Sequence, residues 1–466
     1  MSQHHYKNLI TLGLPIVVGQ LGTIMLSFAD TMMVGRHSMQ ELAAAGLVNN
    51  IFALVLVAYM GFSYGLTPIV GQLYGQDNKE AIGSQLRNAL YANMLTGLIF
   101  MAALFVFYFN LENIGQPPEL LPLIRPYLII NILSLPFVGV FNTLKQTLDG
   151  MTHTAVSMWV MMSCNMLNIL FNWFLIYGVC GFPELGLFGA GLSTVGSRVL
   201  MSLALVVILC RKKSLAAVRS GLAASSFSRP DFLKLNKLGW VISLQMGMET
   251  AAFSLSSILA GWLGTKPLAA HQVMMTVSQV FFMVYYGLAA ALSIRISIFV
   301  GNKDFAAVRR IVLDCAVLLA IVCAIVAIPV LLLRHDIGGW FTDDQDVIAM
   351  VASLILVLIV YQIGDGMQIL FGNSLRGIAY VKPLVPMAFL AFFVVSLPLG
   401  YIFAFPCHMG IIGVWGAFPF GLTTAGVLYC LAFYRKLRVI SSRPQPTRGA
   451  AAADSWSGRS QLVERP

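Results

Sequence analysis

The run Ile311–Leu333 reads IVLDCAVLLAIVCAIVAIPVLLL, with Asp314 as its single charged residue. A helix needs about 20 mainly apolar residues to cross the hydrocarbon core of a bilayer. The run therefore predicts a membrane-spanning helix, and comparable runs recur along the chain. The candidate spans are about 10–34, 46–70, 88–109, 125–148, 155–178, 187–211, 236–262, 270–298, 311–333, 350–374, 384–406 and 411–434.

The composition agrees with a chain that lies mostly in lipid. Of its 466 residues, 58% are hydrophobic and only 10% are charged, with a mean hydropathy of +0.82. A soluble protein carries about a quarter of its residues as charged side chains. The polar covering of a soluble surface is missing, so most of the outer surface must face the bilayer.

The charge and the cysteines argue against two other classes of protein. The net charge is +10, but the basic residues form no patch with interleaved aromatic residues, so nucleic-acid binding is not indicated. The seven cysteines are scattered, their number is odd and no CxxC occurs, so neither a disulfide framework nor a zinc site is predicted.

The connecting segments alternate in charge. Basic residues concentrate in the segments 79–87, 211–237, 303–310, 376–382 and 435–438, whereas Glu112, Glu119, Glu184 and the acids of 336–346 lie in the other set. Positive charge is retained on the cytoplasmic side of a membrane. We therefore predict an even number of spans, about twelve, with both termini in the cytoplasm.

The two halves of the chain resemble each other. Gly13, Gly35, Gly61 and Gly75 recur 226 positions later as glycines, and Tyr59 recurs as Tyr285. Six spans in each half return the chain to its starting side, so the repeats are parallel and related by a pseudo-two-fold axis along the membrane normal. We predict an all-α membrane protein with an amino-terminal lobe (1–210), a basic cytoplasmic linker (211–235), a carboxyl-terminal lobe (236–440) and a disordered tail (441–466). Parallel repeats of this kind place a cavity between two bundles, as in transporters.

Three acids lie inside predicted spans. Glu249 and Asp365 lie near the centres of the seventh and tenth spans, and Asp30 lies nearer the outer end of the first. An ionisable residue within a span is costly and usually marks function. Polar residues share a helix face with each acid at intervals of three or four positions. These residues are Gln245 and Ser256; Tyr361, Gln368 and Gly372; Gln20, Thr23 and Ser27; and, on the fifth span, Asn165, Asn168 and Asn172.

Carboxylate, amide and phenol oxygens suit Na⁺, and a desolvated carboxyl group can instead exchange a proton. A purely structural alternative is that the acids pair with buried cations such as Arg198, or that they cap neighbouring helices. The asparagines of the fifth span could equally hold helices together.

Taken in order, these residues resemble the NorM-type branch of the multidrug and toxic compound extrusion (MATE) family. The resemblance rests on two six-span halves, Glu249, Tyr361 with Asp365, and Asp30 in SFADTMMVGR, and it covers about residues 8–436. It implies that Glu249, Asp365 and Tyr361 bind the coupling cation. It also implies that Asp30, Asn168 and Asn172 form a second cation or proton site.

The resemblance also suggests where substrate binds. In this family the glutamine at the position of Gln272, in the run LAAHQ, lies near bound drug. Some relatives place a tyrosine near the cation on the eighth span, where this chain has Phe282 with Tyr285 and Tyr286 nearby. We predict substrate contacts from Gln272, Gln245, Gln368, Tyr285 and Phe282.

The resulting prediction is a secondary active antiporter of the bacterial inner membrane. It would export lipophilic, often cationic, compounds in exchange for Na⁺ or H⁺, as a monomer without a resident cofactor, a catalytic metal or enzymatic activity. A first rival is a lipid-linked oligosaccharide flippase of related architecture, which would need a basic cavity for pyrophosphate. A membrane-embedded enzyme would need a nucleophile–base pair or a metal cluster at a membrane face, and a sensor without transport is a third possibility.

Overall fold

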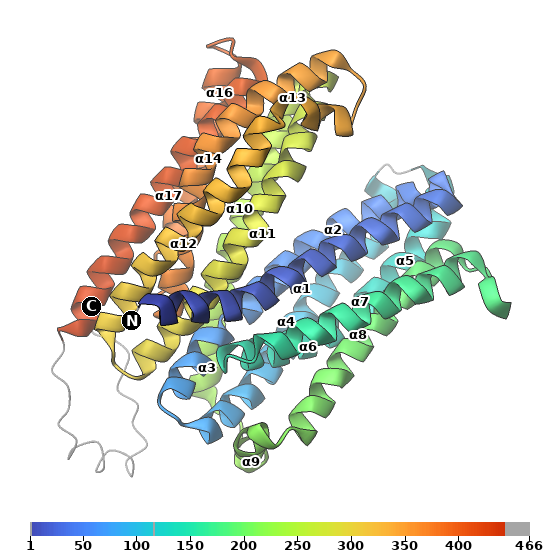
Figure 1. Ribbon diagram of the computed structural model, residues 1–466. Helices are drawn as coiled ribbons and strands as arrows, with labels where there is room; N and C mark the ends of the chain where they lie inside the picture. Colours follow the sequence, from blue (N-terminus) through green and yellow to red (C-terminus); the bar gives the residue numbers. More distant parts are fainter. Residues whose placement is uncertain (1, 115–116, 443–466) are drawn as a thin grey trace, which may run out of the picture.

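The computed structural model describes residues 2–114 and 117–442, and these residues form two bundles of long helices (Figure 1). The predicted tail from 443 onward lies outside the described residues. The first bundle, called the N-lobe here, comprises α1 (Ser2–His37), α2 (Met39–Ser63), α3 (Leu66–Gly75), α4 (Lys79–Phe109), α5 (Leu121–Leu133), α6 (Leu135–Gly150), α7 (Thr154–Tyr177) and α8 (Gly186–Arg211). The second bundle, the C-lobe, comprises α10 (Arg229–Trp262), α11 (Thr265–Gly301), α12 (Phe305–Leu332), α13 (Arg334–Ile337), α14 (Gln345–Gly377), α15 (Leu384–Phe389), α16 (Leu397–Ala404) and α17 (Gly410–Ser441).

Eleven helical segments of the described residues are long and apolar enough to cross a membrane. Several combine two helices, because α2 with α3, α5 with α6, and α15 with α16 each form one candidate span. The twelfth long helix is α10, whose polar residues, among them Gln245 and Glu249, lower its hydropathy. The prediction of an all-α membrane protein with about twelve spans in two repeats is confirmed.

The predicted linker is not a plain coil. It contains the short helix α9 (Ala216–Ala224), which packs against α4, and the guanidinium of Arg87 donates to the backbone oxygen of Leu222 at 2.5 Å. Helix α10 begins at Arg229, inside the range predicted for the linker. The boundaries 1–210, 211–235 and 236–440 remain predictions about how the chain divides.

The internal repeat extends to the helix caps. Asn78 precedes α4 and accepts a hydrogen bond from the backbone nitrogen of Ala81 at 3.1 Å. Asp304 precedes α12 and accepts one from Ala307 at 2.9 Å. Both pairs are displaced by 226 positions. A side-chain oxygen at this position satisfies a backbone N–H that the first helical turn leaves unpaired, so both repeats start this helix in the same way.

The lobes pack together through glycines that the repeat preserves. A Cβ atom on Gly61 would lie 2.9 Å from the Cα of Ser243, and one on Gly287 would lie 3.1 Å from the backbone nitrogen of Val17. Gly287 and Ser243 stand 226 positions after Gly61 and Val17, so a pseudo-two-fold axis relates the two contacts. The same relation holds between the contact of Gly75 with Ile298 and that of Gly301 with Gln72. The absence of a side chain lets the helix backbones approach at these positions.

These contacts lie at one end of the molecule, called the contact end here. From there the N-lobe and the C-lobe diverge (Figure 1). Beyond the contacts, four of the helices that meet in them expose polar side chains: Thr23 and Ser27 on α1, Asn50 on α2, Ser254 on α10, and Gln272 and Thr276 on α11. Polar groups within spans face water or other protein groups rather than lipid. The diverging half of the interface is therefore suited to an aqueous binding region.

Candidate functional site: an acidic cluster in each lobe

Asp30 on α1 belongs to a polar cluster inside the N-lobe. The Nδ2 atom of Asn172 donates to Asp30 Oδ1 at 2.5 Å and to Asn168 Oδ1 at 3.0 Å. Asn168 in turn donates to the hydroxyl of Ser197 on α8 at 3.2 Å. Asn168 and Asn172 are fully buried on α7, whereas Asp30 is partly exposed. The structure brings together the three residues predicted for this lobe and adds Ser197, which the sequence did not indicate.

Arg198 does not form a fixed ion pair with Asp30. Its guanidinium donates to Ser134 Oγ at 2.5 Å and to Asn131 Oδ1 at 3.3 Å, and it lies 5.0 Å from the centroid of the Phe52 ring. Its charge acts on Asp30 through space only. The carboxylate is therefore available to a cation that enters from the exposed side.

Glu249 on α10 is the centre of the cluster in the C-lobe. Gln245, one helical turn earlier, donates to Glu249 Oε2 at 3.0 Å, and the side chain of Gln368 on α14 also hydrogen-bonds the carboxylate. Arg376 on α14 donates to Gln245 Oε1 at 2.5 Å. A chain of contacts thus runs from the carboxylate of Glu249 through an amide to a guanidinium.

The position of Arg376 departs from the sequence analysis. We assigned it to a basic connecting segment, but it lies in the last turn of α14 and only 8% of its surface is exposed. The guanidinium reaches back into the lobe because Gln245 offers an acceptor there. The positive charge of Arg376 acts on Glu249, and the negative charge of Glu249 compensates it within the protein.

Asp365 and Tyr361, both on α14, lie within the electrostatic reach of Glu249 on α10. Both side chains are buried, and the charge of Glu249 acts on each of them. The Tyr361 ring packs 6.0 Å from the rings of Trp415 and Phe418. Two carboxyl groups close together in an apolar environment repel each other when both are ionised. A shared cation or proton would relieve that repulsion.

Buried oxygens without hydrogen-bond partners mark this region. Among the described residues they include Asp365 Oδ2, Gln368 Oε1 and Gln362 Oε1 in the C-lobe, and Asn172 Oδ1 in the N-lobe. An unpaired buried acceptor is costly. Carboxylate and amide oxygens are also the donors that a hard cation prefers. The donor set therefore fits a small monovalent cation or a proton.

The residues predicted to contact substrate fall into two groups. Gln245 and Gln368 are buried and belong to the cluster around Glu249. Gln272 is exposed on the diverging half of α11, whereas Tyr285 is buried and Phe282 stacks on Tyr286 with ring centroids 5.8 Å apart. Gln272 is therefore the member of the set that an incoming ligand can reach directly in this conformation.

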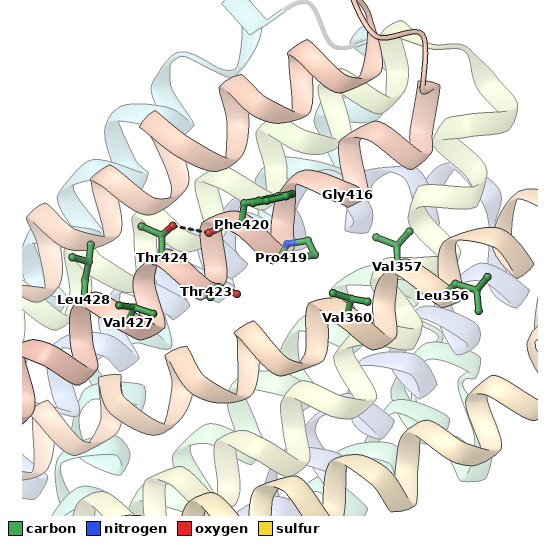
Figure 2. A pocket seen from close by; sticks show the side chains of 10 residues that line it. All are labelled: Leu356, Val357, Val360, Gly416, Pro419, Phe420, Thr423, Thr424, Val427 and Leu428. Atoms are coloured by element: carbon green, nitrogen blue, oxygen red, sulfur yellow. Dashed lines mark hydrogen bonds between the residues drawn. The ribbon is translucent and has the colours of Figure 1, made fainter.

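An apolar groove of about 780 Å³ lies between α14 and α17, apart from the acids (Figure 2). It is lined mainly by hydrocarbon, and Gly364 packs against Thr423 between the two helices. Its lining has no charged side chain, so it suits a hydrocarbon chain rather than an ion. The lining residues are Leu356, Val357, Val360, Gly416, Pro419, Phe420, Thr423, Thr424, Val427 and Leu428.

The fold and the buried carboxylates define a multi-pass membrane protein with the plan of a transporter. The family model MatE matches residues 15–174 and again residues 242–402, one match in each lobe. The chain belongs to the MatE family. The double match also agrees with the internal repeat found in the sequence.

Relatives and solved structures cover nearly the whole chain. It is 29% identical to the probable multidrug resistance protein NorM of Rhizobium meliloti (strain 1021), over 94% of this chain and 95% of the relative. It is 30% identical to the probable NorM of Bradyrhizobium diazoefficiens, over 91% of this chain and 92% of the relative. A crystal structure described as MATE in the bent conformation matches with a TM-score of 0.86 at 19% identity, over 94% of this chain and 97% of that one. The eukaryotic MATE transporter AtDTX14 matches with a TM-score of 0.82 at 18% identity, over 95% and 99%.

Proposed function

We propose that this chain is a secondary active multidrug efflux antiporter, which exports lipophilic and cationic organic compounds in exchange for Na⁺ or H⁺. The observation that carries the proposal is the cluster around Glu249 between membrane helices, in which Asp365 is buried and Asp365 Oδ2 and Gln368 Oε1 lack hydrogen-bond partners. The names of the NorM relatives, which describe multidrug resistance proteins, support the choice of substrates.

The proposed mechanism is alternating access by two rocking lobes. A ligand shifts an equilibrium between two conformations only by its difference in affinity for them. Cation binding at the carboxylates would favour one conformation and drug binding the other, and this difference couples the two fluxes. A cation that moves down 100 mV releases about 2.3 kcal/mol. Since 1.4 kcal/mol is a factor of ten, this energy sustains roughly a 50-fold gradient of a neutral compound.

The proposed location is the bacterial inner membrane, with both termini in the cytoplasm. The basic segments 79–87 and 303–310 follow the ends of α3 and α11, so the positive-inside rule puts the contact end on the cytoplasmic side. The conformation described here would then be open to the outside. The protein would act as a monomeric carrier without catalytic chemistry.

The main rival remains a flippase for lipid-linked oligosaccharides. A pyrophosphate group would need a basic cavity, whereas the exposed and partly exposed groups of the diverging half include Asp30, Ser27 and Gln272. This composition favours cationic or neutral compounds over a pyrophosphate.

Efflux of a fluorescent cationic dye tests the proposal. The cytoplasmic face of everted membrane vesicles is on the outside, so vesicles whose interior is loaded with Na⁺ or acidified should take up dye against its gradient. The ion gradient that is effective identifies the coupling ion. Glu249→Gln and Asp365→Asn should abolish this uptake, whereas Glu119→Gln, which alters an exposed loop acid, should not. Unchanged uptake in the first two variants would exclude both acids from the mechanism.

A further inference from the structure

A small polar cavity lies between the lobes near the contact end. Its volume is about 40 Å³, and it is lined by side chains from α1, α3, α6, α11 and α14 and by Tyr64, which lies between α2 and α3. Residues from both lobes meet in it, so it would change shape whenever the lobes rock. The charged and aromatic members of its lining are Tyr64, Lys145, Asp149, Tyr286 and Arg376.

Lys145 and Asp149 form an ion pair on the N-lobe side of this cavity. The Nζ atom donates to Asp149 Oδ2 at 2.7 Å, and the two side chains are 13% and 3% exposed. The other oxygen, Asp149 Oδ1, is buried without a hydrogen-bond partner. A buried pair of this kind contributes little to stability by itself, but its balance of charge is sensitive to any third charge nearby.

Arg376 supplies that third charge from the C-lobe. Its Nε atom is buried without a partner among the described residues, while its terminal nitrogen donates to Gln245. Asp149 and Arg376 occupy equivalent places in the repeats, because Thr147-Leu148-Asp149-Gly150 corresponds to Ser374-Leu375-Arg376-Gly377 with a displacement of 227. The same helix position thus carries opposite charges on the two sides of one cavity.

We propose that Arg376 is the positioning residue that transmits the ion occupancy of Glu249 to the contact between the lobes. This inference rests on the proposed cation-coupled function. With Glu249 ionised, the charges of Glu249, Arg376, Lys145 and Asp149 cancel. A cation or proton bound at Glu249 leaves one positive charge in excess in the closed cavity.

The excess charge supplies a driving force with a defined direction. A buried, uncompensated charge is costly, and exposure to water relieves the cost. Ion binding at Glu249 should therefore weaken the contact end and favour the conformation in which it opens. In the proposed orientation this step would release the ion to the cytoplasm, as an exporter driven by cation entry requires.

The other polar groups around the cavity do not change this balance. Gln20, Thr67, Gln146, Ser293 and Asn373 are uncharged. The rings of Tyr64 and Tyr286 pack against each other with centroids 6.1 Å apart. The charge of Glu249 acts on Asp365, and the charge of Arg376 acts on Glu249. The electrostatic link between the acids and the cavity therefore runs through Glu249.

Distance measurements between the lobes test the link. Spin labels at Gln76 and Asn302, exposed residues displaced by 226 positions at the contact end, would report its opening in the full chain in lipid nanodiscs. Addition of Na⁺, or acidification, should raise the ratio of open to closed molecules at least fivefold, within the usual range of coupling between two sites. Glu249→Gln should mimic the ion, because it removes the same charge.

Variants of Arg376 separate transmission from binding. Arg376→Gln should abolish the opening of the contact end that the ion causes, while dye binding persists. In the double variant it should also abolish the opening that Glu249→Gln causes. Arg376→Lys, which keeps the charge, should retain much of the response. Arg295→Gln is the matched control, because Arg295 lies 4.9 Å from the ring of Phe299 on α11 and does not line the cavity.

Two variants on the N-lobe side give a second test that leaves Arg376 intact. Asp149→Asn should open the contact end without any ion, because it leaves one positive charge in excess, as ion binding does in the wild type. Lys145→Met should reverse the response, because the charges then sum to −1 without the ion and to zero with it, so ion binding should close the contact end. An ion response that persists in Arg376→Gln, or an ion response of the wild-type sign in Lys145→Met, would overturn the link alone. A wild-type protein that never responds to Na⁺ or pH would overturn both the link and the proposed antiport.

Discussion

Replacing Gly61 with alanine should shift the protein toward the conformation in which the contact end is open. In the present conformation the new Cβ would lie 2.9 Å from the Cα of Ser243 and 3.2 Å from its backbone nitrogen. Both atoms belong to the backbone of α10, so the strain cannot be relieved by rotating a side chain. Opening the lobes removes the clash, because it separates α2 from α10.

The size of the shift follows from the cost of overpacking. Forcing an extra methyl group into a well-packed contact costs about 1–3 kcal/mol. Since 1.4 kcal/mol corresponds to a factor of ten, the ratio of open to closed molecules should rise by roughly 5- to 150-fold. Gly287→Ala should act in the same way, because its Cβ would meet the backbone of Val17 in the pseudo-symmetric contact at 3.1 Å.

The assay is electron–electron distance measurement with labels at Gln76 and Asn302, after the exposed cysteines Cys180, Cys210 and Cys407 have been replaced by serine. Gly247→Ala on α10 is the matched control, since no atom lies within 4 Å of its Cβ position. Both substitutions replace a helical glycine with alanine and raise helix propensity by a similar amount. Any difference in the distance distributions of the two variants therefore comes from the clash. Equal distance distributions for Gly61→Ala and Gly247→Ala would refute the account of how the lobes pack.

Two further predictions concern stability and substrate binding. Tyr59→Phe should lower the free energy of unfolding by about 1 kcal/mol, because it removes a buried hydrogen bond of 2.7 Å to the backbone oxygen of Asn93. Thermal unfolding in detergent measures this loss, with Tyr91→Phe at an exposed position as the control. Equal destabilisation by the two variants would contradict the prediction. Gln272→Ala should weaken binding of a cationic dye by roughly fivefold, the value of about one hydrogen bond, without changing the ion dependence of lobe opening. Fluorescence titration measures the dye affinity. An unaltered dye affinity would remove Gln272 from the binding region.

Much of the fold could be predicted from the sequence because its signals are local. A long apolar run specifies a span wherever it occurs, and the recurrence of glycines at 226 positions needs only a comparison of the two halves. The structure supplies the reason for that recurrence. Gly61 and Gly287, like Gly75 and Gly301, are places where one lobe lies directly against the other.

The surroundings of the acids were less predictable. Gln245 lies beside Glu249 as their spacing of four positions predicts, whereas the spacing of Gln368 relates it only to Asp365 on its own helix, and its hydrogen bond to Glu249 comes from the packing of α14. The burial of Arg376 likewise depends on an acceptor from another helix, 131 positions away in the sequence. No pattern within α14 indicates that contact. The one usable signal in the sequence is the similarity of TLDG at 147–150 to SLRG at 374–377. These segments are displaced by 227 positions, so a comparison of the two halves at a displacement of 226 does not align them.

The two acidic clusters differ in how they can take part in exchange. Both are internal to a lobe, so rocking of the lobes leaves their hydrogen bonds intact. The chain from Glu249 through Gln245 to Arg376 reaches the cavity between the lobes, which ties ion occupancy to the conformational equilibrium. Asp30, which like Glu249 is partly exposed, instead lies on α1, the helix that exposes Thr23 and Ser27 in the diverging half. A cationic compound and the coupling ion can therefore compete for it directly.

This difference predicts separate effects of the two acids. In the wild type, the apparent dissociation constant of a cationic dye should rise in proportion to the ion concentration, because both bind at Asp30. Asp30→Asn should reduce that dependence to less than about twofold, since a neutral amide no longer attracts either cation, while ion-driven opening at the contact end persists through Glu249. Dye titrations at several ion concentrations, combined with distance measurements on the same variant, test both parts. Competition that survives in Asp30→Asn would place the shared site at Glu249 and Asp365, and ion exchange and gating would then reside in a single cluster.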